Sequence, residues 1–156
     1  MKVLDIMTKK VVTTQEDATL ASLRAIFSQA KFQHVPVVDP VGRIIGIVSV
    51  KDYFKAVSPV ADSASEHSLQ LFLQTKKVRQ IMTSPVIHIS VQTSVMQAAA
   101  LLIQHNISAL VVVDGQLRVL GIVSWKDILR VIVQAQQKKQ TQRTAEQRRQ
   151  REGEEE

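Results

Sequence analysis

A serine and an aspartate three residues apart occur twice in this chain, and their spacing points directly to chemistry. Ser49 and Asp52 lie in the segment GIVSVKD, and Ser124 and Asp127 lie in GIVSWKD, 75 positions later. In each copy an apolar run stops at the serine and a helix is expected to start. Free N–H groups at a helix N-terminus attract phosphate, and a carboxylate accepts hydrogen bonds from vicinal ribose hydroxyls. The two pairs therefore predict two places where a nucleotide binds.

The same pairs also have a purely structural interpretation. Ser-x-x-Asp at a helix start forms a capping box, in which the two residues satisfy each other's backbone N–H groups. The aspartate also suits the positive end of the helix dipole. The two interpretations are compatible, because a capped helix start still favours an anion. Lys51 and Lys126 either add phosphate contacts or are simply solvated.

Both pairs belong to an internal duplication. Residues 3–54 laid over residues 78–129, with no gap, give 17 identities in 52 positions. Unrelated sequences of average composition give about one in sixteen. Each copy opens with Ile-Met-Thr, at residues 6–8 and 81–83. The chain is therefore a tandem repeat, and repeats decide the architecture before anything else.

Each copy has the pattern of a β-α-β-β-α unit. Short apolar segments at 11–12 and 86–87 are the first strands, and β-branched runs at 34–39 and 109–114 lead into the hairpin partners at 43–48 and 118–123. Apolar residues recur at helical spacing in the first copy: Leu20, Leu23, Ile26, Phe27 and Ala30. In the second copy, Ser94 to Gln97 predicts a capping box. Strand runs without polar alternation predict an α/β (α+β) fold in which two units pack sheet to sheet around one shared core.

The chain divides into four expected regions: unit 1 at 1–57, a connector at 58–77, unit 2 at 78–133 and a polar tail at 134–156. The connector is loop-like over 58–65, and a short docked helix is expected to follow, carrying Leu69, Leu71, Phe72 and Leu73. The tail is rich in good helix formers but has no apolar stripe. It is expected to be helical or disordered, with a frayed end.

Composition narrows the classes of function. The net charge of +6 is typical of nucleic-acid binders, but only 4% of residues are aromatic, too few for an obvious base-stacking platform. The basic segment 138–151 keeps nucleic-acid binding as an alternative. No cysteine is present, no apolar run is long enough to span a bilayer, and the N-terminus lacks the apolar stretch of a secretory signal. A soluble cytoplasmic protein is expected.

Taken together, the two Ile-Met-Thr starts, the Val-Val-Asp strand ends at Asp39 and Asp114, and the two Gly-Ile-Val-Ser-x-Lys-Asp segments resemble the tandem CBS (cystathionine-β-synthase) domain family. The resemblance covers residues 3–133. It implies two βαββα units related by a pseudo-twofold axis, called a Bateman module, with AMP, ADP, ATP or S-adenosylmethionine bound in the clefts between them. It also implies a homodimer in which two modules form a disc.

The resemblance further implies a crossed arrangement of sites. Ser124 and Asp127 would share a cleft with Thr8, Thr13, Gln33 and His34, and Ser49 and Asp52 would share one with Thr83, His88, Ser108 and Ala109. Some relatives hold a phosphate-reaching cation at the position of His34 and Ala109, and only the first unit supplies a basic group there. The Ser124/Asp127 cleft is therefore expected to be the better nucleotide site.

The expected function is a regulatory module that senses an adenosine compound and signals through a change in inter-unit geometry to an unknown regulated protein. A structural module without a ligand is the alternative. No catalytic group and no required cofactor are expected. The four histidines show no metal-ligand spacing, so no metal site is expected, and Met7 and Met82 are expected in the core. Trp125 is either an exposed contact residue or packed against a neighbouring module.

Overall fold

The computed structural model describes residues 1–29 and 31–154, and its elements occur in two sets of the same order. Single 3-10 turns, Val3–Asp5 and Val78–Gln80, begin the two sets. The strands are β1 Thr14–Gln15, β2 His34–Val38, β3 Ile44–Ser49, β4 His88–Ile89, β5 Ala109–Val113 and β6 Val119–Ser124. The helices are α1 Leu20–Phe27, α2 Val50–Ser63, α3 Glu66–Thr75, α4 Val95–His105 and α5 Trp125–Glu154. The predicted β-α-β-β-α unit is present twice.

Each unit has a three-stranded sheet with the same topology and register. β1 pairs parallel with β2, which pairs antiparallel with β3, and β4, β5 and β6 repeat this order. His34 lies opposite Ser49, and Ala109 lies opposite Ser124. The first strands lie further along the chain than predicted, since the apolar pairs at 11–12 and 86–87 precede β1 and β4. That prediction is wrong because strand pairing with β2 and β5, not local apolarity, decides where these strands form.

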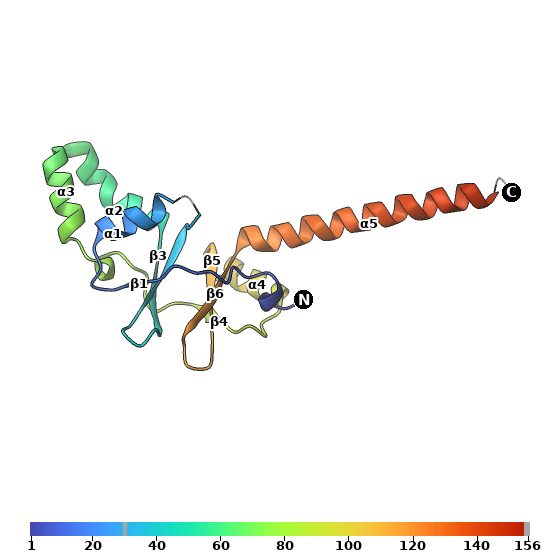
Figure 1. Cartoon of the computed structure of the whole chain (residues 1–156), viewed down its shortest axis with the longest axis horizontal. Helices are drawn as coiled ribbons and strands as arrows, with labels where there is room; N and C mark the ends of the chain where they lie inside the picture. The colour runs from blue at the N-terminus through green and yellow to red at the C-terminus, as the bar shows by residue number, and fades with distance from the viewer. Residues whose placement is uncertain (30, 155–156) are drawn as a thin grey trace.

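The two sheets face each other in the middle of the molecule (Figure 1). One buried cluster lies between the first sheet and its helices, and a second lies between the second sheet and its helices. A smaller third cluster joins the sheets through Ile44, Val111 and Val113. Sheet-to-sheet packing is therefore confirmed. The prediction of one shared core is wrong in detail, because the helices on the outer faces give each unit a core of its own.

The start of each repeat crosses to the other unit. Val3 is fully buried in the second unit's cluster, and Val78 is fully buried in the first unit's cluster. Backbone hydrogen bonds fix the crossings: Thr8 and Ile122 exchange two, at 2.9 and 3.0 Å, and Thr83 and Ile47 exchange two, at 2.9 and 3.1 Å. Each unit thus completes the other, which holds the two units at a defined position.

Glycine permits these crossings. A Cβ at Gly121 would lie 2.8 Å from both the Met7 sulfur and the Thr8 carbonyl oxygen, and a Cβ at Gly46 would lie 2.6 Å from the Met82 sulfur. Met7 and Met82 are half-buried against the unit cores, as predicted. The glycine of each Gly-Ile-Val-Ser segment therefore leaves room for the crossing strand.

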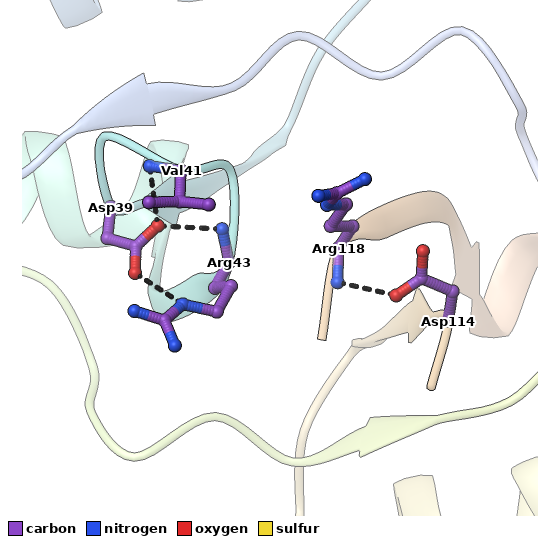
Figure 2. Close-up of polar contacts among 5 residues, drawn as sticks. All are labelled: Asp39, Val41, Arg43, Asp114 and Arg118. Carbon is purple, nitrogen blue, oxygen red and sulfur yellow. Dashed lines mark hydrogen bonds and ion pairs between the residues drawn. The ribbon is translucent and has the colours of Figure 1, made fainter. Parts of the chain in front are cut away.

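Aspartates close both β-hairpins (Figure 2). The strand register places Ser49 and Ser124 at the opposite end of these hairpins. Asp39 Oδ1 accepts hydrogen bonds from the N–H groups of Val41 and Arg43 at 3.0 and 2.9 Å, and its Oδ2 accepts from Arg43 Nε at 2.9 Å. Asp114 accepts from the N–H groups of Gln116 and Arg118. These bonds, chiefly those from the backbone N–H of Arg43 and of Arg118, hold the pKa of both carboxyls below the ordinary value. The Val-Val-Asp ends are turn formers.

The connector is more helical than predicted. α2 continues to Ser63 through Pro59, so the expected loop over 58–65 is wrong. Proline removes one helical hydrogen bond, but α2 packs against both α1 and α3, and this packing outweighs the loss. α3 confirms the predicted docked helix, and its Leu73 is buried in the first unit's cluster. Ala30, which belonged to the predicted α1 pattern, lies outside the described residues.

α5 leaves the body as a single rod (Figure 1). It remains helical to Glu154, so the helical form of the predicted tail is the one observed, and a frayed end is not seen within the described residues. Strong helix formers and i,i+4 contacts, such as Arg148 Nε to Glu152 Oε1 at 3.0 Å, support it. Among the helices of the described residues, none combines the length and apolarity needed to cross a bilayer.

Candidate functional site

Both Ser/Asp pairs form the predicted capping boxes. Asp52 Oδ2 accepts the N–H of Ser49 at 2.9 Å, and Ser49 Oγ accepts the N–H of Asp52 at 3.1 Å. In the second unit, Asp127 Oδ2 accepts the N–H of Ser124 at 2.8 Å, whereas Ser124 Oγ lies 3.4 Å from the Asp127 N–H. The boxes hold the start of α2 and of α5 at the ends of β3 and β6. The structural interpretation of the pairs is thus confirmed, and the capping hydrogen bonds fix the position of each serine and aspartate.

The start of α5 faces the first unit across a cleft of about 310 Å³, which we call the Ser124 cleft. Ser124 and Asp127 line it together with Thr8, Gln33 and His34 of the first unit. The structure therefore brings together all of the residues expected here except Thr13. Thr13 is exposed just before β1 and does not line the cleft. Its neighbour Thr14 is buried, and strand alternation turns Thr13 to the opposite face.

The start of α2 faces the second unit across a larger cleft of about 790 Å³, the Ser49 cleft. Ser49 and Asp52 line it with Thr83, Ser108 and Ala109. His88 does not line it, because Ile89 of the two-residue strand β4 is buried and His88 points the other way. The crossed grouping implied by the family resemblance is thus what the geometry gives, apart from the equivalent positions Thr13 and His88.

Trp125 lies between the two clefts and lines both. Its side chain is 47% exposed, and Lys126 Nζ lies 5.8 Å from the centre of its ring. An exposed aromatic face beside a cleft is suited to stacking on a planar heterocycle.

His34 also lines both clefts, and it connects the units directly. Its Nε2 lies 2.8 Å from Ser108 Oγ. Burial lowers the pKa of His34 below its ordinary value, and the Asp52 carboxylate acts in the opposite direction. His34 is therefore neutral at pH 7 and already hydrogen-bonded. The sequence interpretation made it the phosphate-reaching group, and the structure gives it the role of a bridge between units.

Other basic groups surround the Ser124 cleft instead. Lys10, Lys31, Lys126 and Arg130 line it. Of these, sequence reasoning considered only Lys126. Lys10 and Lys31 were missed although they lie two residues from Thr8 and from Gln33, and that proximity to predicted site residues was the available signal. The positive charge of the Ser124 cleft therefore comes from these three lysines and Arg130, and not from His34, which the sequence had suggested.

The two aspartates differ in which carboxylate oxygens are free to accept a further hydrogen bond. Asp127 Oδ2 accepts from the Ser124 backbone and hydroxyl, and its Oδ1 accepts from Arg130 Nη1 at 3.2 Å. Asp52 uses Oδ2 for the cap, and within residues 1–29 and 31–154 its Oδ1 has no hydrogen-bond partner. In the same part of the chain, no group of three or more His, Asp or Glu side chains comes together as a metal site would require.

Two stretches of the chain, residues 3–59 and 78–134, match the family model of the CBS domain. The chain belongs to the CBS domain family. The matched stretches coincide with the two structural repeats, and the crossed clefts lie between them. The sequence-based recognition of a tandem CBS protein is confirmed.

The CBS pair is similar to proteins of different sizes. It is 34% identical to the homoserine O-acetyltransferase of Methanococcoides burtonii over 130 residues, which make up 83% of this chain and 24% of that protein. The chain thus spans about a quarter of that relative. The CBS domain pair of protein MJ0100, solved in complex with 5′-methylthioadenosine and S-adenosyl-L-methionine, has a TM-score of 0.73 and 28% identity, and the match covers 86% of this chain and 98% of that one.

A third similarity concerns the fold alone. CBSX2, solved in complex with AMP, is 23% identical, with a TM-score of 0.70 and coverage of 86% of this chain and 98% of that one. The mixed α/β architecture with two three-stranded sheets is therefore that of CBS domain pairs.

Proposed function

We propose that this chain is a regulatory module that binds an adenosine-containing ligand, namely AMP, ADP, ATP or S-adenosylmethionine, in the clefts between its two CBS units. The observation that carries the proposal is the pair of crossed clefts, each with a capped helix start on one side and the opposite unit on the other. The ligands of the similar CBS domain pair of protein MJ0100, 5′-methylthioadenosine and S-adenosyl-L-methionine, support the adenosine class.

The chemistry of a nucleotide matches the parts of the Ser124 cleft. Phosphate suits the start of α5 together with Lys10 and Lys31. Asp127 accepts hydrogen bonds from ribose hydroxyls once Arg130 turns from it to the phosphates. Adenine fits against the Trp125 ring. We therefore rank the Ser124 cleft first for nucleotides, on the strength of its lysines and not of His34.

The ligand would act by population shift. A molecule held between the units contacts both, so it stabilises the inter-unit geometry that fits it best. Binding to the folded state also raises the melting temperature by mass action. The output would pass to a regulated protein through this change in geometry, with the module acting as a sensor and not as an enzyme.

A ligand panel in a thermal melt tests the proposal. AMP, ADP, ATP and S-adenosylmethionine are added separately, and at least one is expected to raise the melting temperature. AMP and ATP titrations of Asp127→Ala and Asp52→Ala then test the ranking, since Asp127→Ala is expected to lose more affinity. Equal loss from both variants would contradict the ranking. If no ligand shifts the melt, the module is structural and the proposal fails.

We also propose that a second copy of this chain is a partner, bound through an apolar face on α4 and α5. The exposed residues are Met96, 79% exposed, Ile103, 82%, Leu129, 48%, Ile132, 59%, and Val133, 53%. In the first unit, α3 packs on the equivalent helices α1 and α2. α4 carries no Lys, Arg, Asp or Glu. Two copies with a net charge of +6 each repel one another, and α4, which has none of these charged residues, allows the closest approach.

Sedimentation velocity tests the dimer. Ile103→Lys places a charge on the most exposed of these residues and is expected to shift the chain to the monomer. Val41→Lys is the matched control. Val41 is also exposed, at 62%, but it lies in the β2–β3 hairpin turn and not on α4 or α5. A wild-type chain that sediments as a monomer over the micromolar range would contradict the proposal.

A further inference from the structure

The 75-residue repeat relates the two clefts position by position. Five positions of the clefts carry the same residue type in both repeats. The pairs are Thr8 and Thr83, Ile122 and Ile47, Ser124 and Ser49, Lys126 and Lys51, and Asp127 and Asp52. All of these residues line their cleft. The clefts therefore share one frame, and differences at the remaining positions determine how their binding properties differ.

Three positions differ in charge or basicity. Lys10 corresponds to Pro85, Lys31 to Asn106 and His34 to Ala109. The first of each pair lines the Ser124 cleft and the second lines the Ser49 cleft, and the neutral His34 lines the Ser49 cleft as well. Arg130 lines the Ser124 cleft, whereas its counterpart Lys55 does not line the Ser49 cleft. The Ser124 cleft thus has four permanent cations and one carboxylate, and the Ser49 cleft has one lysine and one carboxylate. The first attracts polyanions, and the second is neutral.

The Ser49 cleft also has an apolar wall and more room. Val86, Ile87, Leu102, Ile103 and Ile107 line it, and its volume is about 790 Å³ against about 310 Å³ for the Ser124 cleft. Asp52 lines this space, and its Oδ1 has no hydrogen-bond partner among the described residues, while both oxygens of Asp127 are engaged. The free carboxylate oxygen suits ribose hydroxyls, and the apolar wall suits an uncharged 5′ substituent.

We propose that the Ser49 cleft takes an adenosine compound without phosphate, a nucleoside or its 5′-thioether, while the Ser124 cleft takes the phosphorylated nucleotide. The module then responds to two ligand classes at once. This inference rests on the proposed function and adds the ligand class of the second cleft. Each phosphate brings one to two negative charges, which one lysine beside one aspartate does not balance. A neutral nucleoside brings no unbalanced charge, and its apolar 5′ substituent packs against the apolar wall of the cleft.

Isothermal titration of the full chain with ATP and with 5′-methylthioadenosine tests the inference. One ATP is expected per chain, and one 5′-methylthioadenosine is expected to bind with unchanged affinity when ATP is already saturating. Asp52→Ala is expected to remove only the thioether binding. Lys31→Asn, which copies Asn106, is expected to weaken ATP roughly tenfold, as for the loss of a hydrogen bond to a charged group, and to leave the thioether unaffected. Lys9→Asn is the control, because the exposed Lys9 lines neither cleft.

Each outcome separates the two claims. Two ATP molecules per chain, or competition between ATP and the thioether for one site, would overturn the inference and leave the proposed function standing. No binding of either probe would overturn the proposed function and the inference with it. Circular dichroism and thermal melts of each variant establish that a lost signal reflects the cleft and not the fold.

Discussion

Replacing Gly121 by alanine puts a methyl group into the crossing that builds the Ser124 cleft. The new Cβ would lie 2.8 Å from the Thr8 carbonyl oxygen and 2.8 Å from the Met7 sulfur. An unstrained carbon-to-oxygen contact is about 3.3 Å or longer, so the crossing segment must move away by about half an ångström. The two Thr8–Ile122 backbone hydrogen bonds, now 2.9 and 3.0 Å, would stretch beyond the usual range.

The magnitude follows from these contacts. Two backbone hydrogen bonds contribute about 1 kcal/mol each, and overpacking adds about 1–3 kcal/mol. Alanine gains back roughly 0.5–1 kcal/mol, because it restricts the unfolded chain more than glycine does. The expected loss of unfolding free energy is about 2–4.5 kcal/mol. For a chain of this length each kcal/mol corresponds to about 2–4 °C in melting temperature.

Gly46→Ala is the matched comparison within the same fold. Its Cβ would lie 2.6 Å from the Met82 sulfur and 3.2 Å from the Met82 Cγ, but 3.3 Å from the nearest backbone atom, the Thr83 oxygen. A methionine side chain is flexible and can move aside, so the expected loss is about 1 kcal/mol or less. Gly115→Ala is the control without a clash, since apart from its two chain neighbours no atom lies within 4 Å of its Cβ position. It is expected to leave the stability unchanged or to raise it by up to about 1 kcal/mol.

Urea unfolding followed by circular dichroism gives the three free energies under one set of conditions. The order of loss is expected to be Gly121→Ala first, then Gly46→Ala, then Gly115→Ala. Gly121→Ala is also expected to weaken nucleotide binding, because Thr8 and Ile122 both line the Ser124 cleft. Equal losses at Gly121 and Gly46 would refute the claim that backbone, and not side chain, limits the crossing.

Three further predictions concern the caps, the bridge and the tail. Ser49→Ala is expected to reduce the unfolding free energy by about 0.5–2 kcal/mol through loss of the cap. Ser124→Ala is expected to reduce it by less, because the hydrogen bond that Ser124 Oγ accepts is 3.4 Å long and the one that Ser49 Oγ accepts is 3.1 Å. Chemical denaturation measures both losses. His34 has a folded pKa below the ordinary 6.5, so the unfolded chain takes up its proton first, and stability is expected to be complete above about pH 6.5 and to fall as the pH drops toward the folded pKa. His34→Gln should flatten that part of a pH–stability profile, and an unchanged slope would contradict the assignment. Truncation after Val133 is expected to leave nucleotide affinity in calorimetry unchanged, because the removed part of α5 lines neither of the two clefts; RNA or DNA binding that depends steeply on salt and disappears on truncation would instead support the nucleic-acid alternative.

Local patterns in the sequence were sufficient for the elements that depend on nearby residues. The helices capped at Ser49, Ser94 and Ser124 and the hairpin turns at Asp39 and Asp114 follow from short-range spacing. A cap or a turn is formed by residues within about four positions of each other. Family recognition then supplied the crossed pairing of the units.

Predictions failed where a distant partner decides the outcome. The first strands form where β2 and β5 offer pairing and not at the nearby valines, and α2 passes through Pro59 because α1 and α3 pack against it. Thr13 and His88 were expected in the clefts, but each is exposed next to a buried residue, Thr14 or Ile89, and neither lines a cleft.

The sequence by itself determined that two equivalent helix starts, each with a serine and an aspartate, exist in this protein. Only the tertiary structure decided what each one faces. The crossing of residues 3–8 and 78–83 places Lys10 and Lys31 beside the Ser124/Asp127 pair, and Pro85 and Asn106 beside the Ser49/Asp52 pair. The charge of a cleft is a sum over residues brought together from both units, and no local pattern contains that sum.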